Sequence, residues 1–173
     1  MKNIIKVLIR SVSIYLLNFP AHFLYGYFPN NFTALFFPVN ESIFQHMKMI
    51  FTCYIIFYLI IKIFKYKEEN ITTKCLISSL SCIIFFLIIY IPIYLNYNEN
   101  LVFTLILLFL SIVFGEFITS LINIKSKTSN KLAVLAIISI FIFSAYLTFN
   151  PLDNFWFFDP MNRTYDMVCN KNY

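Results

Sequence analysis

The chain has 173 residues, of which 60% are hydrophobic and only 12% are charged, and its mean hydropathy is +0.77. Soluble domains carry about twice that charged fraction, so the composition excludes an ordinary water-soluble domain and indicates an integral membrane protein. The net charge of +5 comes mainly from Lys and Arg in short loops between apolar segments, which argues against a nucleic-acid partner and for the lipid bilayer as the partner.

Five apolar segments are each about long enough to cross a hydrocarbon core ~30 Å thick. A segment in lipid must satisfy its own backbone hydrogen bonds, so each is predicted to be a transmembrane helix. The expected fold is an all-α polytopic membrane helix bundle forming a single transmembrane domain, residues 1–173. In chain order, the predicted spans cover residues 4–25, 43–63, 75–95, 101–124 and 132–149, followed by a tail of residues 150–173.

The first segment is interpreted as a retained span, because Arg10 interrupts it and no small-residue cleavage site follows. The loop after it, residues 26–39, is itself rich in Phe. A freely solvated loop would not carry so many large apolar side chains. This loop is therefore expected to lie in the membrane interface or to dip back as a short re-entrant segment.

The basic residues predict an orientation. Under the five-span prediction, ten of the thirteen Lys and Arg residues fall on one side of the membrane: Lys2, Lys6, Arg10, Lys62, Lys65, Lys67, Lys74, Lys125, Lys127 and Lys131. The positive-inside rule then puts the N-terminus in the cytoplasm and the C-terminal tail outside. A multi-pass protein of the cell membrane is expected, and the abundance of Ile, Asn, Lys, Phe and Tyr indicates a bacterial origin.

Polar side chains concentrate in the stretch PVNESIFQHMK, which runs from Pro38 to Lys48. Asn40 is predicted to be the N-cap of the second span, with Glu41 in the first turn complementing the helix dipole. Ser42 and His46 are four residues apart and would share one helix face. Capping explains Asn40 and Glu41, but it does not explain the pair of Ser42 and His46.

The topology predicts that both histidines and the acidic tail lie on the outer face of the membrane. The expected outer polar cluster comprises His22, Asn40, Glu41, Ser42, His46 and Asp159. Two histidines and a carboxylate are a competent ligand set for a catalytic Zn²⁺, so His22, His46 and Asp159 are the candidate metal ligands. The alternative is a hydrogen-bonded cluster that pins the tail onto the helix ends and needs no cofactor.

Glu116 is the one acidic residue well inside a predicted span, where it falls in the inner half. A carboxylate in lipid is costly and is expected to face the bundle. It would bond a neighbouring Ser or Thr, reach the cytoplasmic Lys residues, or handle protons or cations. Ser111 and Gly115 nearby form a pair of small residues that would let another helix approach closely.

Three short segments resemble an uncharacterised family of small bacterial multi-pass membrane proteins. They are HFLY at His22–Tyr25, FFPVNESIFQHMK at Phe36–Lys48, and the terminal FFDP and YD. Members of that family carry a PVNESxWEHxK-like signature and a closing FxDPxxxxYG-like segment. This chain has Phe44 and Gln45 where Trp and Glu are usual, and Asp166 where Gly is usual. The resemblance implies the fold class and no activity.

The spacing of Ser42 and His46 is also similar to the SxxxH element of a superfamily of membrane-embedded zinc hydrolases that includes alkaline ceramidases and adiponectin receptors. Those proteins use a further HxxxH pair in a late helix. That pair has no counterpart in this chain, since His22 and His46 are its only histidines.

The sequence therefore predicts an integral membrane protein of unknown biochemical function, whose outer cluster is structural or binds a partner or ligand. This interpretation requires a cluster that is internally paired, with no cavity opening onto it. A metal-dependent hydrolase at the outer leaflet is one alternative, and it requires His22, His46 and a carboxylate to converge within about 4–5 Å. A small transporter is the other, and it requires Glu116 to line a polar path to the cluster, with a homo-oligomer because five spans are few.

Overall fold

The computed structural model describes residues 2–64, 69–96, 100–122 and 127–165 of the chain. Within these ranges the protein is all-α, and five helices are long and apolar enough to cross a membrane. They are α1 (Lys2–Tyr27), α3 (Ile43–Ile63), α4 (Ile71–Asn96), α5 (Leu101–Leu121) and α6 (Lys127–Phe149). The predicted fold class and the five predicted spans are confirmed.

The helix bounds differ from the predicted spans mainly at the ends. α3 has the predicted bounds, whereas α1, α4 and α6 each begin earlier in the sequence than predicted. α5 ends at Leu121, and positions 123 and 124 of the predicted span lie outside the described residues. Also outside them are the basic residues Lys65, Lys67 and Lys125 and the last part of the tail, residues 166–173.

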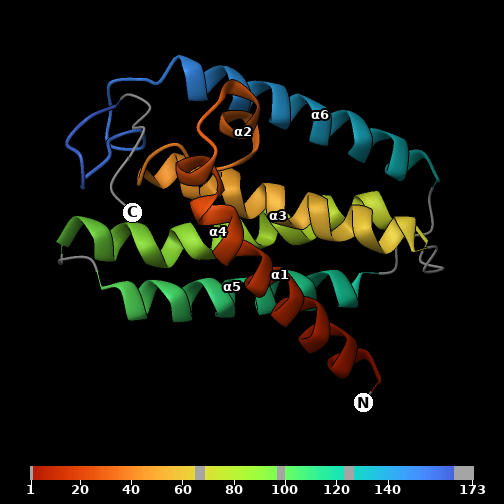
Figure 1. The fold of residues 1–173 in the computed structure, drawn as a ribbon. Coiled ribbons are helices and arrows are strands. Elements are labelled where there is room, and N and C mark those ends of the chain that lie inside the picture. The colour runs from red at the N-terminus through yellow and green to blue at the C-terminus, as the bar shows by residue number, and fades with distance from the viewer. Residues whose placement is uncertain (1, 65–68, 97–99, 123–126, 166–173) are drawn as a thin grey trace.

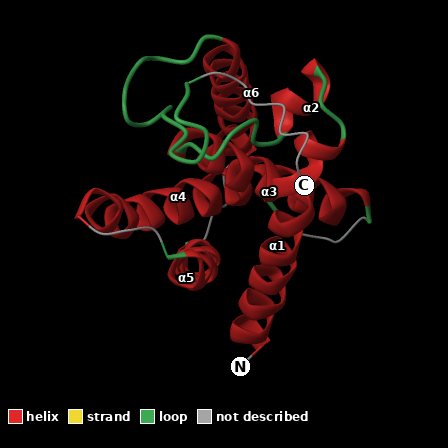
Figure 2. Ribbon diagram, turned by 60° about the vertical axis from the view of Figure 1, so that its left-hand side comes forward, coloured by secondary structure: helices red, strands yellow, loops and turns green. Residues whose placement is uncertain are grey.

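Three of the other long helices, α3, α5 and α6, pack on α4. α5 and α6 lie on opposite sides of the layer that α3 and α4 form, and α4 contacts both of them (Figures 1 and 2). α1 crosses this arrangement obliquely and packs on both α3 and α5. The centre of the bundle is apolar and fully buried, with Ile14, Tyr54 and Ile112 inaccessible to solvent. This core separates the two polar ends of the molecule.

The Phe-rich loop after α1 contains a short helix, α2 (Asn31–Phe36), which lies between α1 and α6 (Figure 1). A capping box starts it, because the Asn30 side chain accepts from the Thr33 amide and the Thr33 hydroxyl accepts from the Asn30 amide. Lys48 of α3 anchors α2 from inside the bundle. Its ammonium donates to the carbonyl oxygen of Ala34 at 2.7 Å and to the hydroxyl of Thr148 on α6 at 3.1 Å. Lys48 thus joins α2, α3 and α6.

α4 and α5 approach each other closely at Gly115 of α5. A Cβ atom at this position would collide with the backbone oxygen of Ser78 on α4 and would lie 3.0 Å from the hydroxyl of Tyr54. Ser111, one turn earlier, is fully buried and donates to the carbonyl of Leu107. The pair of small residues therefore lies where α4 and α5 meet, because absent side chains let the two backbones come together.

We predict that Gly115→Ala destabilises the bundle, because the added methyl group forces α4 and α5 apart. Overpacking of this kind costs about 1–3 kcal/mol, so the thermal unfolding midpoint in detergent should fall by several degrees. Ser120→Ala is the matched control, since Ser120 is an exposed residue of the same helix. Equal midpoints for the wild type and Gly115→Ala would contradict the close approach.

Candidate functional site

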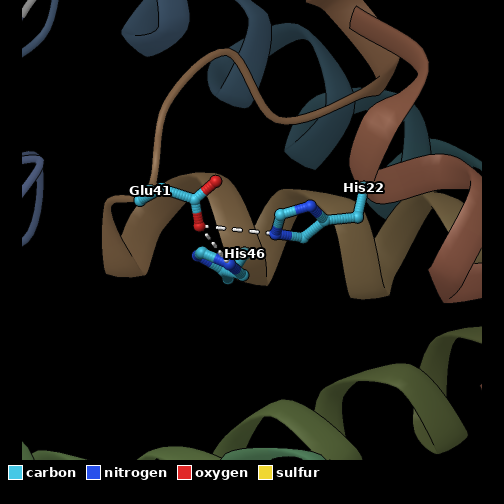
Figure 3. A group of neighbouring side chains, drawn as sticks. All are labelled: His22, Glu41 and His46. Carbon is cyan, nitrogen blue, oxygen red and sulfur yellow. Dashed lines mark ion pairs between the residues drawn. The ribbon is translucent and has the colours of Figure 1, made fainter. Parts of the chain in front are cut away.

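His22, Glu41 and His46 meet at one end of the bundle, although they come from α1, from the loop before α3 and from the first turn of α3. Figure 3 shows the carboxylate of Glu41 reaching both imidazole rings. The Nε2 atoms of His22 and His46 each lie 3.3 Å from Oε2 of Glu41, and the two ring centroids are 5.3 Å apart. One ligand atom from each of the three residues lies within 4.8 Å of the other two. Together these residues form the candidate metal centre.

The start of α3 differs from the prediction in a way that creates this arrangement. Asn40 is not the N-cap; its side-chain oxygen accepts from the amide of Ser42 at 3.1 Å and forms a turn that precedes the helix. Ser42 is the cap, because its hydroxyl accepts from the amide of Gln45. Glu41 consequently lies outside the first turn, where its side chain reaches the imidazoles.

The ring of His46 is held in one orientation. Its Nδ1 lies 2.9 Å from the carbonyl oxygen of Ser42, one turn back in the chain. A carbonyl oxygen only accepts hydrogen bonds, so Nδ1 carries the proton and donates it. Nε2 faces the Glu41 carboxylate, to which it can only donate a hydrogen bond, and it becomes the nitrogen that binds a metal ion once the metal replaces that proton. Histidines that bind metals in proteins almost always make this second hydrogen bond.

Glu41 is an anion between the two rings. Burial raises the pKa of its carboxyl, but hydrogen bonds with His22 and His46 and the charges of the two imidazoles lower it by more, so that the pKa lies well below its usual range. The side chains of all three residues are about a quarter exposed. The group therefore combines an ionised carboxylate with two imidazole nitrogens at a position that a small ligand can reach.

Asp159, the carboxylate that the sequence suggested as third metal ligand, lies outside this group of three. It is fully buried, and its oxygens accept from the amides of Glu41, Met161 and Asn162 and from the side chain of Asn162. Its own amide donates to the carbonyl of Thr164. Asp159 thus ties the tail to the loop that carries Glu41, and Glu41 occupies the place that the sequence reasoning gave to Asp159.

A second contact holds the tail on the start of α3. The amide of Phe44, which the Ser42 cap leaves without a partner inside the helix, donates to the carbonyl of Trp156 at 2.9 Å. The rings of Phe44 and Phe157 pack at a centroid distance of 4.6 Å. The tail and the start of α3 therefore form one folded unit beside the metal centre.

The candidate metal centre opens onto a cavity of about 460 Å³. Residues from α3, α4, α5 and the tail line it together with the three polar side chains: Ile43, Phe86, Tyr90, Leu101, Thr104 and Met161. Most of these are apolar, and Thr104 and Tyr90 add hydroxyl groups. Sequence reasoning missed them, because they come from four segments that are separate in the chain and no local motif marks them.

Glu116 lies in a separate polar group, deep between α1, α3, α4 and α5. It is only 2% exposed, and the hydroxyls of Tyr58 and Ser78 lie 3.0 and 2.8 Å from its Oε1. The guanidinium of Arg10 lies 3.8 Å from its Oε2. The bond to a serine is one of the roles expected for this residue. The pairing with Arg10 was missed, because Arg10 was read only as a topology signal.

Comparison with known proteins identifies the family and no activity. A family of unknown function (DUF6512) matches residues 1–167, almost the whole chain. No curated protein and no solved structure matches the sequence.

If the three residues form a metal site, purified wild-type protein equilibrated with Zn²⁺ should carry about one zinc per chain after dialysis, as measured by elemental mass spectrometry. His46→Ala and Glu41→Gln should each reduce the zinc content to below about a tenth, because two ligands hold zinc too weakly.

Asp159→Asn distinguishes the two possible carboxylates. We expect this variant to keep its zinc, since Asp159 lies outside the group of three. A variant that unfolds at the wild-type temperature but has lost its zinc would instead assign the ligand role to Asp159. Zinc content that does not differ between the wild type and His46→Ala would remove the site altogether.

Proposed function

The chain belongs to the family of unknown function DUF6512, and we propose that it is a membrane-embedded, metal-dependent hydrolase in which His22, Glu41 and His46 hold a Zn²⁺. The observation that carries this proposal is the convergence of these three side chains at the wall of a cavity. The sequence suggested that the polar cluster binds a ligand, and the proposal specifies that ligand as Zn²⁺ and the reaction as hydrolysis.

The chemical type of the three candidate ligand atoms and the distances between them both suit zinc. Two atoms bound to one Zn²⁺ at ~2.0–2.2 Å in a tetrahedral site are about 3.3–3.5 Å apart. Both distances from a histidine Nε2 to the Glu41 carboxylate are 3.3 Å. The hydrogen bond from His46 Nδ1 to the Ser42 carbonyl supplies the outer partner that orients a metal ligand.

Three protein ligands leave a fourth position for water or substrate, the arrangement that distinguishes catalytic from structural zinc sites. When bound in such a site, zinc lowers the pKa of a coordinated water to about 7 and polarises a carbonyl oxygen. The cavity beside the ligands is where the substrate would bind. Its apolar residues, among them Phe86 and Leu101, suit a hydrocarbon chain, and the hydroxyls of Tyr90 and Thr104 suit the polar group to be cleaved. The substrate class that fits is an acyl ester or amide with an apolar tail.

The proposed location of this activity is the outer leaflet of a bacterial cell membrane. The basic residues favour a cytoplasmic N-terminus, and α1 then carries His22 to the outer side. The loop before α3 and the tail would lie on the same side, so an amphipathic substrate could enter the cavity from the bilayer.

The other two interpretations of the sequence have less support. A purely structural cluster required internal pairing, which the contacts of Glu41 with both histidines provide. It also required that no cavity open onto the cluster, whereas a cavity of about 460 Å³ does. A transporter required Glu116 to line a path to the outer cluster, whereas Glu116 lines a different pocket, at the opposite end of α5 from Leu101 and Thr104. A homo-oligomer is compatible with the hydrolase but is not needed by it.

The proposal predicts metal-dependent release of fatty acid from acyl esters or amides by purified protein in vesicles. Wild-type protein should lose the activity when a chelator removes zinc and should regain it when zinc is restored. His46→Ala and Glu41→Gln should fall to the background rate. Thr104→Val, which leaves all three ligands in place, should bind zinc normally and hydrolyse more slowly.

Zinc-loaded wild-type protein that hydrolyses neither esters nor amides would contradict the hydrolase proposal while leaving the metal site intact. Activity that survives both chelation and His46→Ala would place the chemistry elsewhere in the molecule.

A further inference from the structure

A second pocket, of about 160 Å³, lies at the other end of α1 and α5 from the metal centre. Three basic residues line it, namely Lys6 and Arg10 from α1 and Lys74 from α4, and Asn3 adds an amide. Among the described residues Glu116 is the one acidic residue in the lining, so the ordinary charges of these lining residues sum to two positive charges. Such an excess of positive charge in a partly enclosed space favours an anion.

Arg10 is held in place for this role. It is only 8% exposed, its guanidinium lies 5.8 Å from the centroid of the Tyr58 ring, and it faces the Glu116 carboxylate at 3.8 Å. Glu116 itself is fixed by the hydroxyls of Tyr58 and Ser78. The ion pair therefore positions a planar, five-donor cation at the pocket, which suits the tetrahedral oxygens of a phosphate.

The size and the surroundings of the pocket restrict the class of ligand that it can bind. Water occupies ~30 Å³ per molecule in the liquid, so 160 Å³ accommodates a group about as large as a phosphate with its first substituent. Large apolar side chains that adjoin the lining residues in sequence are exposed on α1 and α5, including Ile9, Phe117 and Leu121. These surfaces suit the acyl chains of a lipid whose headgroup enters the pocket.

We propose that the pocket formed by Lys6, Arg10 and Lys74 binds a phosphate-type anion, supplied by the headgroup of an anionic phospholipid. Basic pockets between transmembrane helices are a known mode of recognition for such headgroups. The proposal is independent of the hydrolase, because it uses no residue of the metal centre and lies at the other end of the bundle.

Binding can be measured by native mass spectrometry of the purified full-length protein titrated with phosphatidylglycerol, with zwitterionic phosphatidylcholine as the comparison lipid. Lys6→Gln and Lys74→Gln should each weaken the binding of phosphatidylglycerol about five-fold, as expected for one basic residue near a headgroup. Lys131→Gln is the matched control, since Lys131 on α6 is outside the lining of the pocket. Thermal unfolding of each variant shows that the fold is retained.

Three outcomes separate the possibilities. Preferential binding of phosphatidylglycerol that weakens in Lys6→Gln and Lys74→Gln alone supports the lipid headgroup. Displacement of the lipid by inorganic phosphate would keep the anion site but assign it to the free ion. Equal retention of phosphatidylcholine, or an equal loss in Lys131→Gln, would overturn the proposal.

Discussion

Polar groups inside a membrane bundle are removed from water, so burying them costs least when they form hydrogen bonds or ion pairs within the protein. Two groups of buried side chains in this molecule show this constraint. Glu116 meets Arg10, Tyr58 and Ser78 near one end, and Lys48 meets Ala34 and Thr148 nearer the other. Because the partners come from different helices, each polar contact also fixes how those helices lie together.

The candidate metal centre depends on the same constraint in a subtler way. The residues proposed to bind the metal come from α1, from the loop before α3 and from the first turn of α3, and the loop has to hold Glu41 facing both rings. Asp159 provides that restraint, because it is fully buried and accepts the backbone amide of Glu41. The tail thus supports the candidate site without supplying a candidate ligand. The two carboxylates differ in burial: Asp159 is fully buried and holds the loop, whereas Glu41 is about a quarter exposed and faces the imidazoles.

The spans were predictable because lipid imposes a simple rule on long apolar segments, and the five predicted helices are the five observed. The meeting of both histidines with a carboxylate at one end followed from topology. The identity of that carboxylate did not follow from topology, because topology gives the side of the membrane and not the direction of a side chain.

The N-cap of α3 was predicted wrongly for a similar reason. Asn40 and Ser42 are both good N-cap residues, and the turn between them decides which one caps the helix. The pairing of Arg10 with Glu116 needs the packing of α1 on α5, which no local pattern encodes.

That last pair has a consequence for how the protein is made. Arg10 enters the membrane with the first helix, and Glu116 is not synthesised until the fifth. Until then the guanidinium has no access to this counter-charge, although the Tyr58 ring of the earlier helix α3 lies 5.8 Å from it in the finished bundle. The contact of α1 with α5 can therefore be sealed only after four helices have been made, while α6 and the tail are still to come.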